Sequence, residues 1–133
     1  MAETDHSGQV LAVKTLAMPA DTNPSGDIFG GWLMAQMDIA GGVVAYERAQ
    51  GRTVTIAVDG MTFLKPVYVG DLVTCYARII REGRTSLSIL IEAFARRGRT
   101  SEEVKVTAGT FTYVALGEDR KPRPLPAPAP NAG

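Results

Sequence analysis

The stretch Ile28-Phe-Gly-Gly-Trp-Leu-Met-Ala-Gln-Met-Asp-Ile-Ala-Gly-Gly-Val-Val-Ala-Tyr-Glu-Arg-Ala-Gln50 decides the fold. It is the one long helix that the chain predicts, with Asp27 as its N-cap and Gly51 as the residue that ends it. In its central part only Gln36 and Asp38 are polar, so the helix is apolar on nearly every side. Such a helix lies in a core or spans a membrane. An acid and four glycines interrupt the apolar run, which favours the core.

Strands are expected on both sides of this helix. Their residues alternate between polar and apolar side chains or are rich in β-branched residues, as in half-buried antiparallel strands. The expected strands are residues 10–18, 53–61, 72–81, 86–95 and 103–115. The pattern predicts an α+β fold in which a five-stranded antiparallel sheet wraps around the central helix. One helix cannot cover every apolar face of such a sheet, so we also expect an oligomer.

The length of 133 residues predicts one domain. We divide the chain into a flexible N-terminus (1–9), a single domain (10–116) and a Pro/Ala-rich C-terminal tail (117–133). Two Gly-containing stretches, 83–85 and 98–101, are expected to be hairpin turns.

Composition excludes several classes of function. Lys+Arg and Asp+Glu are both 14, so a general nucleic-acid binder, which would need a basic excess, is not expected. The single cysteine, Cys75, permits no intrachain disulfide and no cysteine-built zinc site, and it is expected to be a structural thiol. The single histidine, His6, lies in a polar terminal stretch, where a catalytic role is not expected. The first residues contain no apolar signal segment, so we expect a cytoplasmic protein without membrane insertion.

Asp38 is the residue that needs an explanation. Its helical neighbours are almost all small, including Gly41 and Gly42, and no Lys or Arg lies within one turn to pair with it. An unpaired buried charge is costly, and each interior glycine costs roughly 1 kcal/mol relative to alanine. Sequences that break local rules in this way often do so at a functional site. Spacing alone leaves open a structural role, in which Asp38 accepts hydrogen bonds and the glycines permit close packing.

Two weaker signals accompany the helix motif. Residues 26–31, Gly-Asp-Ile-Phe-Gly-Gly, enter the helix, and a glycine-rich helix start offers free N–H groups that can polarise a carbonyl. A plain capping loop is the alternative. The stretch Gly83-Arg-Thr-Ser86 offers a cation, two hydroxyls and turn amides that suit a phosphate, although it is also typical of a solvated hairpin tip. Trp32, Met34 and Met37 are expected in the core.

Together these segments resemble the bacterial YciA-type acyl-CoA thioesterases of the hotdog fold. The resemblance runs from about residue 10 to residue 126, and the helix motif is its most specific part. It is carried by Thr15-Leu-Ala-Met-Pro-Ala-Asp-Thr-Asn23, Gly26-Asp-Ile-Phe-Gly-Gly-Trp-Leu-Met34, Gln36-Met-Asp38, Val58-Asp-Gly-Met-Thr-Phe63, Pro66-Val-Tyr-Val-Gly-Asp71, Cys75-Tyr-Ala77 and Gly83-Arg-Thr-Ser86. The loop Asn23-Pro-Ser-Gly26 departs from the family, where Asn-Ala-Asn-Gly is more usual; Pro24 stiffens it.

The resemblance implies hydrolysis of an acyl-CoA thioester to free CoA and a carboxylic acid. It implies a homodimer formed by joining two sheets and assembled further into a hexamer, a trimer of dimers. CoA is part of the substrate, and no metal or other cofactor is implied. The family's catalytic carboxylate falls on Asp38, and the carbonyl-polarising side falls on the loop that contains Asn23, Asp27 and Gly31. Arg84, Thr85 and Ser86 are the expected contacts with CoA.

Helix geometry adds a constraint. Asp27 and Asp38 are separated by roughly 16 Å if the helix contains both, at 1.5 Å per residue. One thioester carbonyl therefore cannot contact both within one chain, and the site is expected to be shared between two subunits. Asp38 would act as general base on water or attack directly to form a mixed anhydride. The alternatives are a non-catalytic acyl-CoA sensor, a hotdog dehydratase, which would need a well-placed histidine, and a purely structural oligomer.

Overall fold

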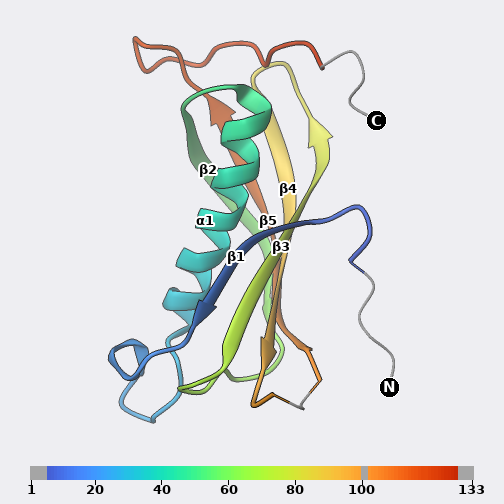
Figure 1. The fold of residues 1–133 in the computed structure, drawn as a ribbon. Helices are drawn as coiled ribbons and strands as arrows, with labels where there is room; N and C mark the ends of the chain where they lie inside the picture. Colours follow the sequence, from blue (N-terminus) through green and yellow to red (C-terminus); the bar gives the residue numbers. More distant parts are fainter. Residues whose placement is uncertain (1–5, 100–101, 129–133) are drawn as a thin grey trace.

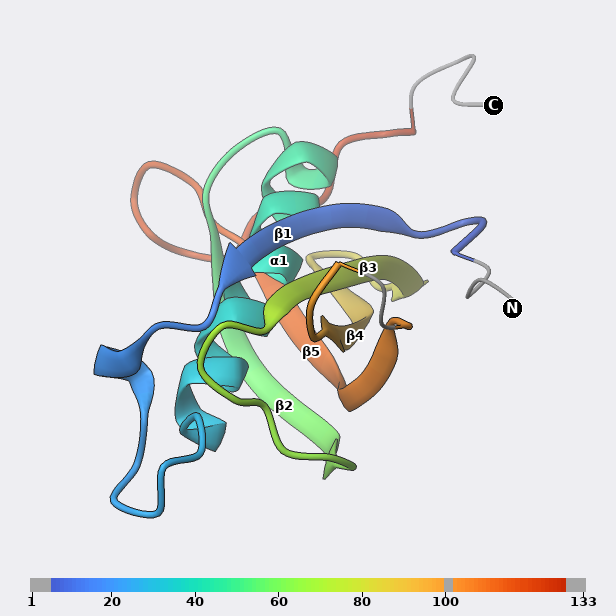
Figure 2. The ribbon, with the colours of Figure 1, turned by 60° about the horizontal axis from the view of Figure 1, so that its bottom comes forward.

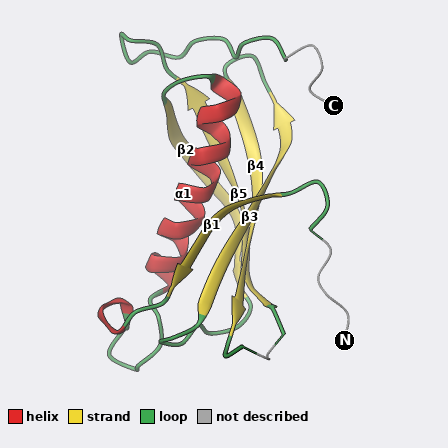
Figure 3. Ribbon diagram, in the orientation of Figure 1, coloured by secondary structure: helices red, strands yellow, loops and turns green. Residues whose placement is uncertain are grey.

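A computed structural model describes residues 6–99 and 102–128 as one long helix packed on one sheet (Figures 1 and 3). The helix, α1, spans Gly30–Ala49, and a short 3-10 helix, η1, spans Pro19–Asp21. The strands are β1 (Val10–Leu16), β2 (Thr53–Phe63), β3 (Leu72–Glu82), β4 (Ser86–Arg96) and β5 (Val104–Ala115). The predicted central helix and five antiparallel strands are confirmed. The predicted turn at 98–101 includes Thr100 and Ser101, which lie outside the described residues.

The sheet curls around the helix. Its strand order is β1-β3-β4-β5-β2, with every neighbouring pair antiparallel. Figure 2 shows β1 and β2 on opposite sides of α1, so the curved sheet partly surrounds the helix. Among the described residues β2 pairs only with β5, which leaves the other edge of β2 without a strand partner.

The core lies between the buried face of α1 and the concave face of the sheet. Strand alternation places every second side chain of β3, β4 and β5 on this face. The helix contributes Leu33, Met37, Ala40, Gly41, Val44, Ala45 and Ala49, and the strands contribute residues such as Val73, Cys75, Ile89, Ile91, Phe111 and Tyr113.

The opposite face of α1 is exposed in the single chain, although it is also apolar. Ile39 is 54% exposed and Tyr46 is 61% exposed, and Met34, which we expected in the core, lies on the exposed side. The prediction was wrong for Met34 because the sheet covers only one side of the helix. Trp32 is half-buried against the core and Met37 is fully buried, as expected. No helix in the described part of the chain is long and apolar enough to span a bilayer.

The helix starts two residues later than predicted, and Asp27 is not its N-cap. Phe29 holds the N-cap position without a side-chain hydrogen bond. The N–H of Ile28 donates to the carbonyl of Val67 at 2.9 Å, and the N–H of Phe29 donates to the carbonyl of Asp21 at 3.0 Å. These contacts to distant segments keep the chain extended up to Phe29. At the other end Gln50 adopts a left-handed conformation and terminates the helix just before Gly51.

Candidate functional site

Asp38 lies in the middle of α1 and accepts hydrogen bonds from two hydroxyl groups of the sheet. Thr55 on β2 donates to its Oδ1 at 2.7 Å. Tyr113 on β5 donates to the same Oδ1 at 3.0 Å and to the Asp38 carbonyl at 2.9 Å. Thr55 and Tyr113 are directly paired across the β2–β5 ladder, so both hydroxyls reach one carboxylate oxygen. The second oxygen, Oδ2, has no hydrogen-bond partner among the described residues.

The charge of Asp38 is balanced by hydroxyls rather than by a cation. The carboxylate is half-buried, and no ion pair within residues 6–99 and 102–128 involves it. Burial, and then the negative charge of Asp38, raise the pKa of Tyr113 far above its ordinary value. Tyr113 therefore remains a protonated donor. A carboxylate with one oxygen fixed and the other free is equipped to accept a proton or to attack an electrophile.

The two glycines after Asp38 have different roles. A Cβ on Gly41 would lie 2.2 Å from the Tyr113 hydroxyl and 2.6 Å from Cδ1 of Ile91, so only glycine permits this approach of helix to sheet. A Cβ on Gly42 would meet no atom within 4 Å. The alternative that glycine serves close packing is correct for Gly41, where the packing itself brings Tyr113 to Asp38.

The loop before the helix is organised by Asn23. Its Oδ1 accepts hydrogen bonds from the N–H groups of Ser25 at 2.9 Å and Asp27 at 3.1 Å, and its own N–H donates to the Asp27 carbonyl at 2.7 Å. The N–H groups of Gly30 and Gly31 have no partner among the described residues, and Gly31 is exposed. The helix therefore presents free donors at its positive end.

A cavity of about 390 Å³ lies beside this loop. It is lined by Asn23, Asp27, Ile28, Gly30, Leu33, Phe63, Leu64, Lys65, Pro66 and Val67. Asp38 does not line it, and the helical rise separates Asp38 from Gly31 by roughly 10 Å. Asp27 shows no contact with Asp38 either, and it serves the loop through its backbone.

The predicted CoA contacts lie at the opposite end of the molecule. Residues 83–86 form the turn between β3 and β4, where the N–H of Gly83 donates to the Ser86 carbonyl at 2.8 Å. The Arg84 side chain is exposed and makes no ion pair within the described part of the chain. In Figure 1 this turn lies near the C-terminal end of α1, whereas the loop before α1 lies at the other end. One chain therefore keeps the loop, Asp38 and the turn apart.

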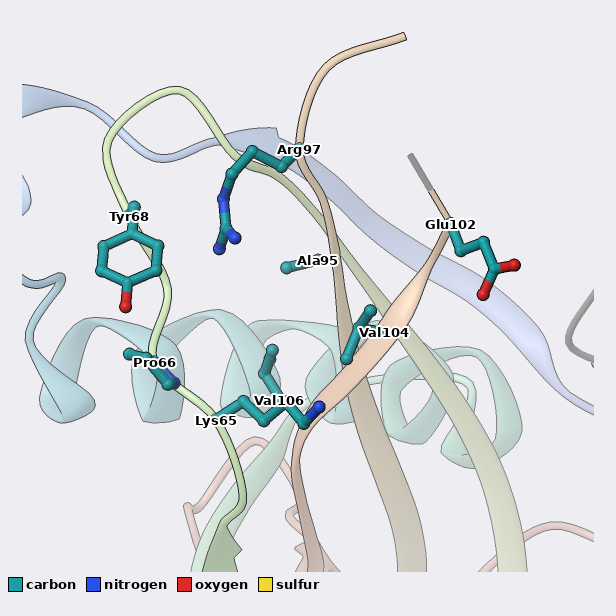
Figure 4. A pocket seen from close by; sticks show the side chains of 8 residues that line it. All are labelled: Lys65, Pro66, Tyr68, Ala95, Arg97, Glu102, Val104 and Val106. Carbon is teal, nitrogen blue, oxygen red and sulfur yellow. The ribbon is translucent and has the colours of Figure 1, made fainter. Parts of the chain in front are cut away.

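A second cavity, of about 320 Å³, has a charged rim that the sequence analysis missed (Figure 4). The guanidinium of Arg97 donates to both carboxylate oxygens of the fully buried Asp71 at 2.9 Å. It also lies 4.4 Å from the ring centroid of Tyr68. The hydrogen bond with Asp71 raises the pKa of Arg97. Asp71 also accepts a hydrogen bond from the N–H of Tyr68, and this contact fixes the turn between Tyr68 and Asp71. Since Asp71 already neutralises Arg97, Arg97 belongs to a structural ion pair rather than to an anion site.

Two residues to which the sequence assigned no chemistry are packed in the structure. Cys75 is fully buried, and burial raises the pKa of its thiol to about 12, so it is an inert core residue. His6 stacks on Tyr76 with the ring centroids 3.5 Å apart, and its Nε2 lies 2.6 Å from Oε1 of Glu103. The described residues contain no cluster of three or more His, Cys, Asp or Glu side chains suited to a metal ion.

Comparison with known proteins identifies the family. The model of the Thioesterase superfamily matches residues 25–102. The chain belongs to this superfamily. It is 56% identical over 119 residues to the acyl-CoA thioester hydrolase YciA of Salmonella typhimurium, covering 87% of this chain and 90% of the relative.

Solved thioesterase structures share the fold. HI0827, a hexameric broad-specificity acyl-coenzyme A thioesterase solved as an aspartate-to-alanine mutant, superposes with a TM-score of 0.87 at 43% identity, covering 92% of this chain and 90% of that one. Cj0915, a hexameric hotdog-fold thioesterase of Campylobacter jejuni, gives a TM-score of 0.84 at 39% identity, covering 87% and 90%. The predicted hotdog fold is thus confirmed.

Proposed function

We propose that this thioesterase-superfamily protein hydrolyses acyl-CoA to free CoA and a carboxylic acid, with Asp38 as general base or nucleophile. The observation that carries the proposal is the half-buried Asp38 carboxylate, with Oδ1 held by Thr55 and Tyr113 and Oδ2 free. The acyl-CoA substrate is supported by the activity named for the YciA relatives. CoA belongs to the substrate, and the proposed reaction uses no further cofactor.

The chemistry requires an acid–base group and a carbonyl-polarising group at one thioester. We assign the second role to the N–H of Gly31, which is exposed and unpaired among the described residues, with Asn23 and Asp27 shaping its loop. In one route Oδ2 of Asp38 removes a proton from water as the water oxygen attacks the carbonyl carbon. In the other route Oδ2 attacks directly, and water hydrolyses the resulting anhydride. In both routes the C–S bond breaks and the thiolate of CoA leaves.

The site is proposed to form between two subunits. Gly31 and Asp38 of one chain are too far apart to contact one carbonyl. The strand β2, which carries Thr55, has one edge that pairs with no other strand in the described part of the chain. Pairing of this edge with a second copy would bring the loop of one subunit toward Asp38 of the other. The hexamers of HI0827 and Cj0915 support a trimer of such dimers.

The test is release of free thiol from a panel of acyl-CoAs, from acetyl to palmitoyl. Asp38→Asn keeps the shape of the side chain but removes its basicity, so we expect kcat to fall by about 10²–10⁴-fold. Glu118→Gln, which removes an exposed carboxylate from the C-terminal segment, is the matched control and is expected to act like wild type. Near-normal kcat in Asp38→Asn would refute the assigned role. Acyl-CoA binding by wild type without turnover would favour the sensor alternative.

Shared sites are tested by mixing two inactive variants. Heterodimers of Asp38→Asn with Gly31→Pro contain one intact composite site if the loop and the acid come from different subunits. We expect these heterodimers to regain measurable turnover that neither parent shows. Confirmed heterodimers without any recovery would count against a shared site.

A further inference from the structure

The C-terminal segment 123–126, here called the C-terminal clamp, is bound across the end of α1. The Nη2 of Arg123 donates to the carbonyl of Ala49 at 2.7 Å, and its Nε donates to the carbonyl of Leu116 at 2.9 Å. Leu125 packs against the hydrophobic core. Although its composition predicted an extended tail, this part of the segment is anchored by specific contacts. Figure 1 shows it passing across the C-terminal end of α1.

The clamp also holds the turn 83–86. The N–H of Leu125 donates to the carbonyl of Arg84 at 2.9 Å. On the next residue of the turn, the carbonyl of Thr85 accepts a hydrogen bond from the N–H of Ala115 at 2.9 Å. The backbone of the turn is therefore tied both to the C-terminal segment and to the end of β5.

Arg48, in the last turn of α1, joins the helix, the clamp and the turn. Its Nε and Nη2 each donate to a carboxylate oxygen of Glu82 at 2.8 Å, and its Nη1 donates to the carbonyl of Pro126 at 2.7 Å. Glu82 is the residue immediately before the turn. These bonds fix the backbone that carries Arg84, while the guanidinium of Arg84 stays exposed and forms no ion pair among residues 6–99 and 102–128.

We propose that the C-terminal clamp holds the turn 83–86 ready to contact the phosphates of CoA, with Arg48, Arg123 and Leu125 as positioning residues. This inference rests on the proposed function. A cation on a fixed backbone binds an anion without first losing conformational freedom, whereas a released turn must lose that freedom on binding. Because Asp38 lies in the middle of the helix, away from the turn, release of the clamp is expected to weaken substrate binding and leave the chemical step intact.

Two truncated chains separate the clamp from the residues that follow it. A chain ending at Lys121 lacks the clamp, and a chain ending at Pro126 retains it. Each is assayed with an acyl-CoA and with the pantetheine thioester of the same acyl group, which has no phosphate. For the chain ending at Lys121 we expect an acyl-CoA KM about tenfold higher, as for loss of one hydrogen bond to a charged group. Its kcat and its KM for the pantetheine thioester are expected to stay near wild type. The chain ending at Pro126 is expected to match the full chain on both substrates.

A pair of point variants covers the case in which the shorter chain does not fold. Leu125→Pro removes the N–H that donates to Arg84, and the neighbouring residues 124 and 126 are already prolines. Leu125→Ala keeps this N–H while removing the same core contacts. We expect the acyl-CoA KM to rise about threefold more in Leu125→Pro than in Leu125→Ala, since only the former loses a hydrogen bond.

The outcomes distinguish the clamp from the proposed activity. An unchanged acyl-CoA KM in a folded chain ending at Lys121, or in Leu125→Pro relative to Leu125→Ala, overturns the inference. An equal rise in KM for both substrates also overturns it, because the clamp would then support the whole site. Calorimetric titration with CoA needs no turnover. Weaker CoA binding without the clamp therefore supports the inference even if the full chain cleaves no acyl-CoA, a result that would reject only the proposed function.

Discussion

The two ends of helix α1 are built in opposite ways. At the N-terminal end the cap residue Phe29 offers no side-chain bond, and the N–H groups of Gly30 and Gly31 have no partner among the described residues. At the C-terminal end Gln50 turns the chain into the left-handed conformation, and the last carbonyls accept bonds from Gln50, Gly51 and Arg123.

This difference separates backbone groups that can contact the reacting carbonyl from backbone groups that hold neighbouring segments in place. Unpaired donors at a helix start carry a partial positive charge and are available to a ligand oxygen. Satisfied carbonyls at a helix end offer a ligand nothing, but they fix the neighbouring segments. We therefore expect changes at the first end to alter turnover, changes in the middle to alter both turnover and stability, and changes at the second end to alter stability or KM.

After Asp38→Asn, the largest effect on kcat is expected at the N-terminal end. Gly31→Pro removes the N–H that we assign to the thioester carbonyl, while the first turn of a helix tolerates proline. Loss of one such donor is expected to lower kcat by about 10²–10³-fold. Gly31→Ala is the matched control, because it keeps the N–H and its Cβ would meet no atom within 4 Å. If both variants, correctly folded, keep the wild-type kcat, then the donor lies elsewhere.

The middle of the helix offers an intermediate test through its adjacent glycines. Gly41→Ala forces a methyl group against Tyr113 and Ile91, and overpacking of this kind costs about 1–3 kcal/mol of unfolding free energy. It also displaces the Tyr113 hydroxyl from Asp38, so kcat is expected to fall. Gly42→Ala meets open space and is expected to stabilise the helix by about 0.5–1 kcal/mol. Denaturant titration measures the free energy of unfolding of both variants. Equal changes in this free energy for Gly41→Ala and Gly42→Ala would contradict the close helix–sheet contact.

The sequence predicted the elements well because their signals are local. Polar and apolar alternation located all five strands, and Asp38 stood out because its helical neighbours are small and uncharged. The start of the helix was placed too early, since the N–H of Ile28 is held by Val67, a residue far along the chain. A capping rule reads only neighbouring residues and cannot detect such a bond.

The partners of Asp38 and the C-terminal clamp were missed for a related reason. Thr55 and Tyr113 reach the carboxylate only because β2 and β5 pair in one register against the helix. In the sequence, Thr55 and Tyr113 each fit the ordinary polar and apolar alternation of their strand. Nothing in that pattern distinguishes them from other strand residues. The clamp has no periodicity, and its hydrogen bonds with distant segments are accepted by backbone carbonyls, which sequence patterns do not reveal.

The smallest effect is expected at the C-terminal end of the helix. Gln50 has φ = 54°, a left-handed conformation that glycine adopts without the steric cost of a side chain. Gln50→Gly is therefore expected to raise the free energy of unfolding by about 0.5–1 kcal/mol and to leave kcat unchanged, because no group near Asp38 or Gly31 moves. Gln50→Ala is the control, since it removes the same exposed side chain but keeps a Cβ and gains nothing at this angle. A change in kcat that accompanies the gain in stability would show that the two ends of the helix are coupled, and the division between a catalytic end and a structural end would then fail.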